Sequence, residues 1–117
     1  MATLLCVGVP VAAADGRHHR LTIDDVVSTS GLDAPVIKRQ LVRRLRARGT
    51  CRVAAPAPAQ RVVVDVTISP TGSARVTAAP AAAIRGCIVA IVTATPFPKP
   101  ANGLAVNATL RFRSVPR

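Results

Sequence analysis

The sequence predicts an α+β domain with two layers, in which two helices cover one face of a three-stranded antiparallel sheet. Two observations support this prediction. Apolar residues recur at helical spacing within 35–48 and 84–91, whereas they alternate with other residues within 62–68 and 104–113. The order is therefore α-β-β-α-β, without an internal repeat. All these apolar stripes are buried together if both helices pack on the same face of the sheet.

Length and charge restrict the class of protein. The chain has 117 residues, half of them hydrophobic and 18% charged, which favours one folded domain over a disordered tail. No apolar run reaches the roughly 20 residues of a membrane-spanning helix, so we expect no stable transmembrane anchor. The formal net charge of +11 indicates an acidic partner or an anionic surface. The arginine bias of a GC-rich genome would produce the same excess.

The first 14 residues, MATLLCVGVPVAAA, contain no charged side chain and end in three alanines. Such a segment is typical of a secretory signal peptide, although the usual basic start is missing. A buried strand is the alternative, because Val7, Val9 and Val11 alternate. We expect residues 1–14 to be a leader, which would place the mature protein in the periplasm or outside a bacterial cell.

Residues 15–31 are polar and contain several turn-forming residues. We expect a flexible lead-in here, or a short helix, because Thr22 followed by Asp25 has the spacing of a capping box.

A basic helix is predicted over residues 35–48. Asp33 can cap its start, Pro35 lies in its first turn and Gly49 follows its last position. The apolar stripe consists of Val36, Ile37, Leu41, Val42 and Leu45. The basic face consists of Lys38, Arg39, Arg43, Arg44, Arg46 and Arg48.

A β-hairpin is predicted after the proline-rich connector 54–59. The alternating segment 62–68 is followed by the turn Ser-Pro-Thr-Gly at 69–72 and by an extended segment at 74–78.

A second helix is predicted where Ile84, Cys87, Ile88 and Ile91 share one face. The proline-rich segment 95–100 ends this helix. The alternating segment 104–113 then predicts the last strand.

Two cysteines lie next to the predicted helices. Cys51 follows the first helix, and Cys87 lies on the apolar face of the second. Their sulfur atoms could meet if both helices cover one face of the sheet. In an exported protein a disulfide follows, and loss of the leader would remove Cys6, the third cysteine. In a cytosolic protein they would remain buried thiols. No metal site is expected, because neither cysteine has the paired spacing of a zinc ligand.

Four segments in sequence resemble the TonB C-terminal domain family, most closely its gliding-motility AgmX/PglI-type branch. They are LDAPVIKRQLVRRLRARGTC, VVVDVTISPTGSARVTAAP, IRGCIVAIV and PFPKPANGLAVNATLRF. The positions that match in order are Cys51, 62–68, Gly72, Cys87, 97–100 and 106–112. The resemblance covers about residues 32–113, and we expect the domain to span 32–115.

The resemblance implies a non-catalytic periplasmic module that captures an extended peptide of an envelope protein by β-strand addition. By position, we expect the last strand to be the sheet edge that receives the peptide. Four of its side chains would lie opposite the helices, where an acidic peptide could bind: Asn107, Thr109, Arg111 and Arg113. Solvated strand residues would show the same pattern.

DNA binding is the alternative function. The segment LTIDDVVSTSGLDAPVIKRQL has the spacing of a helix-turn-helix, in which the basic helix 35–48 would read bases through Arg39 or Arg43. A bulky valine, Val27, at the contact between the helices and the early Pro35 oppose this interpretation.

We expect neither catalysis nor a cofactor. His18 and His19 lie in the lead-in and are expected to be exposed to solvent. Asp24 and Asp25 are expected to flank a helix, and Asp65 has no partner evident in the sequence. No glycine-rich phosphate loop is present.

Overall fold

A computed structural model describes residues 17–117, so the expected leader at 1–14 lies outside the described residues. The elements of this part of the chain, in order, are β1 (His18–Ser28), α3 (Ala34–Arg48), β2 (Thr50–Arg52), β3 (Gln60–Ile68), β4 (Ala74–Ala78), α4 (Arg85–Ala94) and β5 (Val106–Pro116).

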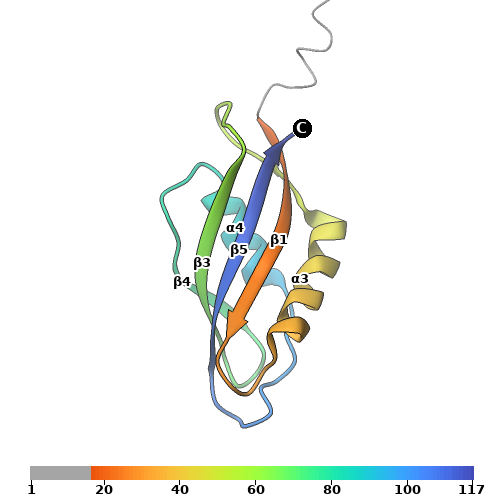
Figure 1. Cartoon of the computed structure of the whole chain (residues 1–117), viewed down its shortest axis with the longest axis vertical. Coiled ribbons are helices and arrows are strands. Elements are labelled where there is room, and N and C mark those ends of the chain that lie inside the picture. Colours follow the sequence, from red (N-terminus) through yellow and green to blue (C-terminus); the bar gives the residue numbers. More distant parts are fainter. Residues whose placement is uncertain (1–16) are drawn as a thin grey trace, which may run out of the picture.

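The described strands form one antiparallel sheet in the order β2-β1-β5-β3-β4. In Figure 1, α4 lies behind this sheet and α3 lies along its β1 side. The predicted α+β class is confirmed. The predicted three strands are wrong in number, because β1 and β2 extend the sheet beyond β5 to five strands.

β1 corrects the expectation of a flexible or short-helix lead-in at 15–31. Residues His18–Ser28 pair with β5 over almost the whole length of the strand. The register shifts between Ile23 and Asp25, so Asp24 is an extra residue that interrupts the alternation. Leu21, Ile23 and Val26 are buried in the core. The domain therefore begins before residue 32.

Both helices end close to their predicted boundaries. α3 has Asp33 at its N-cap position, although the Asp33 side chain makes no capping hydrogen bond, and Gly49 follows its last residue. α3 buries Ile37, Leu41 and Leu45, and α4 buries Ile88, Ile91 and Val92. These side chains join the inner residues of β1, β3 and β5 in one hydrophobic cluster. The single cluster means that both helices cover the same face of the sheet, as predicted.

The hairpin of β3 and β4 is also confirmed. Its turn closes with a hydrogen bond from Ser69 N to Ser73 O at 2.8 Å. Gly72 has a φ of 92°, in the left-handed region, and its carbonyl accepts a hydrogen bond from Phe97 N at 3.2 Å. The turn thereby holds the segment that leads into β5.

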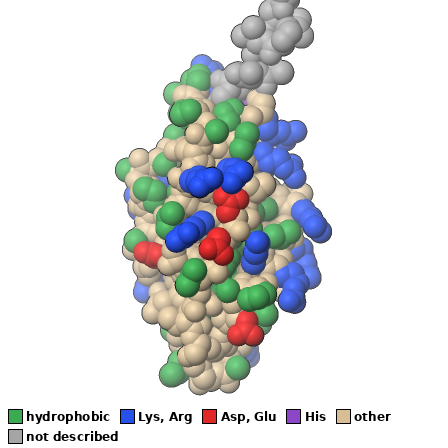
Figure 2. Space-filling view, in the orientation of Figure 1, with side chains coloured by type: hydrophobic (Ala, Val, Ile, Leu, Met, Phe, Trp, Pro, Cys, Tyr) green, Lys and Arg blue, Asp and Glu red, His purple; other side chains and the backbone are tan. Residues whose placement is uncertain are grey.

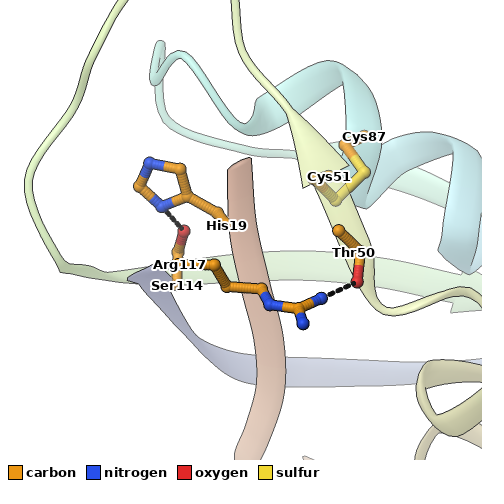
Figure 3. Close-up of a disulfide and its surroundings, with 6 residues drawn as sticks. All are labelled: His19, Thr50, Cys51, Cys87, Ser114 and Arg117. Atoms are coloured by element: carbon orange, nitrogen blue, oxygen red, sulfur yellow. Dashed lines mark hydrogen bonds between the residues drawn. A yellow bond between two sulfur atoms is a disulfide. The ribbon is translucent and has the colours of Figure 1, made fainter. Parts of the chain in front are cut away.

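A disulfide joins Cys51 of β2 to Cys87 of α4, as expected for an exported protein (Figure 3). The two Cα atoms are 6.0 Å apart and 36 positions separate the cysteines in sequence. A crosslink over a loop of this length stabilises a fold by about 4 kcal/mol in the chain-entropy estimate. The bond fastens the short strand β2 to the helical layer.

His19 is fully buried, which corrects the expectation that it is exposed. Its Nδ1 lies 2.6 Å from the hydroxyl oxygen of Ser114, which is also fully buried (Figure 3). Because no solvent reaches this hydroxyl, the pair is part of the core and not an accessible nucleophile and base.

Candidate functional site

The last strand is not an edge of the sheet. β5 pairs with β1 on one side and with β3 on the other. The prediction that β5 is the free edge of the sheet is therefore wrong, because residues 18–28 form a strand that pairs with it instead of a lead-in. On the face of β5 opposite the helices, Asn107, Arg111 and Arg113 are exposed and Thr109 is half-buried.

Three arginines gather on this outer face of the sheet, and we call Arg61, Arg111 and Arg113 the sheet-face cluster. Arg61 of β3 lies directly opposite Arg113 of β5. Arg111 lies between Asp25 of β1 and Val63 of β3. A depression of about 320 Å³ beside the cluster is lined by Arg61 and Arg111 together with Asp24, Asp25 and Val63. Like charges in directly opposite positions destabilise a sheet, so this cluster is suited to an anionic group.

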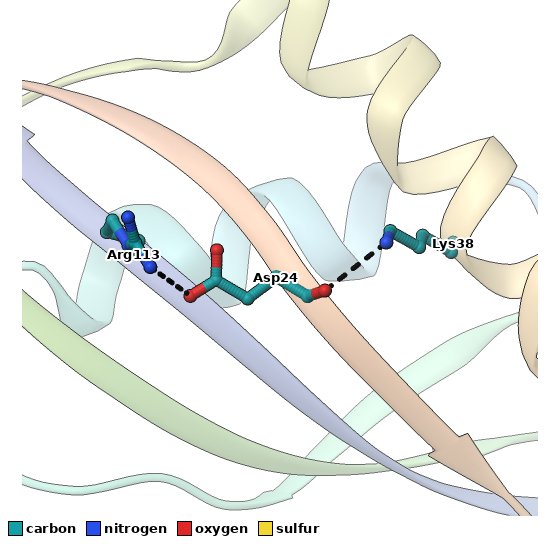
Figure 4. A network of polar contacts seen from close by, with 3 residues as sticks. All are labelled: Asp24, Lys38 and Arg113. Carbon is teal, nitrogen blue, oxygen red and sulfur yellow. Dashed lines mark hydrogen bonds and ion pairs between the residues drawn. The ribbon is translucent and has the colours of Figure 1, made fainter.

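One acidic residue connects the cluster to the helical layer. The Asp24 carboxylate lies 3.3 Å from the Arg113 guanidinium, with both side chains partly exposed. The Asp24 carbonyl accepts a hydrogen bond from Lys38 Nζ of α3 at 3.2 Å (Figure 4). No ion pair is found for Arg61 or Arg111 in the described residues.

The other two residues proposed on β5 are engaged within the sheet. Thr109 Oγ1 donates to the Asp65 carboxylate at 2.9 Å. Thr67 Oγ1 donates to the Asn107 side-chain oxygen at 3.0 Å. These cross-strand contacts lie between the sheet-face cluster and the hairpin end of the molecule.

The free edge of β1 is protected against strand addition. β2 pairs only with residues 18–20 of β1. Beyond them, Lys38 covers the Asp24 carbonyl, and the Asp25 carboxylate accepts from Val26 N at 2.9 Å. A bulge, a lysine and a covering helix are common means by which proteins block an exposed strand edge.

At the other end of the strand order, the first half of β3 has no strand paired to its β4 side. β5 pairs with all of Gln60–Ile68, whereas β4 pairs only with 65–68. Backbone groups point to alternate sides along a strand. Ser69 N donates to Ser73 O across the hairpin, and Asp65 O accepts from Thr77 Oγ1 of β4. The backbone N–H and C=O groups of the odd-numbered residues of β3 therefore point toward the β4 side.

Arg61 and Val63 therefore direct their backbone N–H and C=O groups to the side where β4 is missing. The segment 79–84 makes turn bonds of its own, including Ala82 N to Pro80 O at 2.9 Å. Within residues 17–117, no backbone hydrogen bond joins it to Arg61 or Val63. We call the backbone of these two residues the open edge. The Val63 side chain beside it is 48% exposed.

Sequence reasoning did not find the open edge. The signal was the unequal length of the two hairpin arms, because nine residues form β3 and only five form β4. Pro80 and neighbouring alanines follow β4 and do not continue the pairing.

The basic face of α3 lies where the sequence predicted it. Lys38, Arg39, Arg43, Arg46 and Arg48 are exposed. Arg44 is half-buried, and its Nε has no hydrogen-bond partner in the structure. Figure 2 shows basic side chains both over the sheet and along the flank formed by α3.

The structure contains no helix-turn-helix at residues 21–41. Its expected first helix is β1, whose buried residues belong to the sheet. The basic helix therefore lacks the partner helix that this DNA-binding motif requires.

The fold is thus a two-layer α+β domain with an arginine-rich open sheet face and one open strand edge. No family model, curated protein or solved structure matches this chain. None of the helices in residues 17–117 is long and apolar enough to cross a membrane. No group of three or more metal-binding side chains occurs in the same part of the chain.

Proposed function

We propose that this protein is a non-catalytic binding module of the bacterial periplasm that captures an extended peptide by β-strand addition. The observation that carries the proposal is the open edge, where Arg61 and Val63 present two backbone donors and two acceptors in strand geometry. An extended peptide satisfies such groups by continuing the sheet. The resemblance to TonB C-terminal domains supports the same mode of binding.

The surroundings of the open edge suit a segment of an envelope protein that carries acidic side chains. Added strands place alternate side chains on the outer face, beside exposed Val63 and the sheet-face cluster. The Cys51–Cys87 disulfide supports an extracytoplasmic location, because such bonds persist in oxidising compartments.

Substitution of Val63 tests the proposal. Val63→Pro removes one outward-facing N–H at a position where an edge strand tolerates proline. The probe is an extended peptide selected on the wild-type protein from a displayed random library. We expect Val63→Pro to weaken the binding of this peptide by about tenfold. Isothermal titration calorimetry measures the change.

Val63→Thr is the matched control, because it alters the same side chain and keeps the N–H. We expect this variant to bind within about twofold of wild type, since no backbone hydrogen bond is lost. Equal affinity of the proline and wild-type proteins would contradict strand addition at this edge, and so would a library that yields no binder.

A further inference from the structure

A second surface lies on the flank formed by α3, away from the open edge. Two adjoining depressions of about 420 and 210 Å³ run along this helix and share Val42 and Arg46. The first is lined by Lys38, Arg39 and Arg43, and the second reaches Arg20 of β1. The first depression lies on α3 itself and the second between α3 and the protected edge of β1, and together they form a groove bordered by cations.

The cations of this groove are not neutralised within the helix. α3 contains no Asp or Glu, and Arg39, Arg43 and Arg46 follow one another at helical spacings of four and three residues. Like charges at such spacings destabilise a helix. Asp24, the neighbouring acid on β1, directs its carboxylate to Arg113 and offers Lys38 only its carbonyl. The surface is therefore complementary to an external polyanion.

Apolar groups lie between these cations. Pro35 and Val42 line the same depression as Arg39 and Arg43. A basic helix face with interleaved apolar residues suits the interface of an anionic bilayer, which offers phosphates and acyl chains together. Duplex DNA offers phosphates without comparable apolar surface, and the helix-turn-helix that would present this helix to a groove is not formed.

We propose that α3 docks the protein on the surface of an anionic phospholipid bilayer. Arg39, Arg43 and Arg46 bind lipid phosphates, and Val42 contacts the apolar boundary between them. α3 lies on the β1 side of the sheet, whereas the open edge lies on the β4 side (Figure 1). Docking by α3 therefore leaves the open edge accessible, and neither proposal depends on the other.

Vesicle co-sedimentation of the full chain tests the proposal with two triple variants of equal charge. The first is Arg39→Gln, Arg43→Gln and Arg46→Gln on the helix flank. The second replaces three exposed arginines elsewhere: Arg61→Gln, Arg75→Gln and Arg111→Gln. The vesicles contain phosphatidylcholine alone or phosphatidylcholine mixed with phosphatidylglycerol.

We expect the wild-type protein to bind only the vesicles with phosphatidylglycerol. The helix variant should lose affinity on the order of 100-fold, because each cation near the membrane surface contributes about fivefold and three are removed. The control should change less than about threefold. The single variant Val42→Ser should bind these vesicles more weakly than the wild-type protein, although its charge is unchanged.

Equal losses in the two triple variants would overturn the proposal, because net charge alone would then explain binding. Duplex DNA that binds more tightly than vesicles would assign the surface to nucleic acid instead.

Discussion

Gly72 shows how a single residue fixes the hairpin and the segment that follows. Its φ of 92° belongs to the region that favours glycine, and a Cβ at this position would meet the carbonyl oxygen of Phe97. The turn glycine was predicted from the sequence Ser-Pro-Thr-Gly. Its contact with Phe97 was not, because that contact depends on the path of the chain after α4.

We expect Gly72→Ala to lower the free energy of unfolding by about 3 kcal/mol, from backbone strain and the clash together. Gly103→Ala is the control, because Gly103 also has a positive φ of 71° but open space around its Cβ position. It should cost about 1 kcal/mol. Urea denaturation compares the two variants, and equal losses would contradict the role given to the Phe97 contact.

His19 illustrates a residue whose environment the sequence does not reveal. Its neighbours in the chain are polar, which favours exposure. Burial follows from the pairing of β1 with β5, which brings Ser114 to the histidine ring across 95 positions. Such long-range placement is not encoded in local composition or periodicity.

At the scale of elements, α3, α4 and the hairpin were predictable because their periodicities are regular. β1 was missed because Asp24 inserts one residue between Ile23 and Asp25 and changes the spacing of the apolar residues. The spacing of Thr22 and Asp25 then favoured a helix. A bulge is compatible with pairing in a sheet, but it hides the alternation that identifies a strand.

A chain that begins at residue 32 tests the importance of β1. It lacks Leu21, Ile23 and Val26, whose burial contributes about 5–9 kcal/mol, comparable to the whole stability of a small domain. We expect this chain to show no cooperative thermal transition by circular dichroism. A chain that begins at residue 17 keeps all described elements and should unfold cooperatively. Equal melting temperatures would show that β1 is dispensable.

The arrangement of the whole molecule was only partly predictable. The helices cover one face, as their apolar stripes required. The strand order differs, because β1 occupies the side of β5 that was expected to be free. This change moves the proposed binding edge from β5 to β3, while the basic helix face keeps its predicted residues. The molecule consequently presents its open edge toward the β4 end of the strand order and its basic flank toward the β1 end.

Residue-resolved amide hydrogen exchange tests the open edge most directly. In the free protein, we expect the amides of Val62 and Val64 to exchange slowly because they face β5, and those of Arg61 and Val63 to exchange rapidly. Addition of the selected peptide should slow exchange at Arg61 and Val63. Slow exchange at these two amides in the free protein, or binding that leaves them unprotected, would contradict peptide capture at β3.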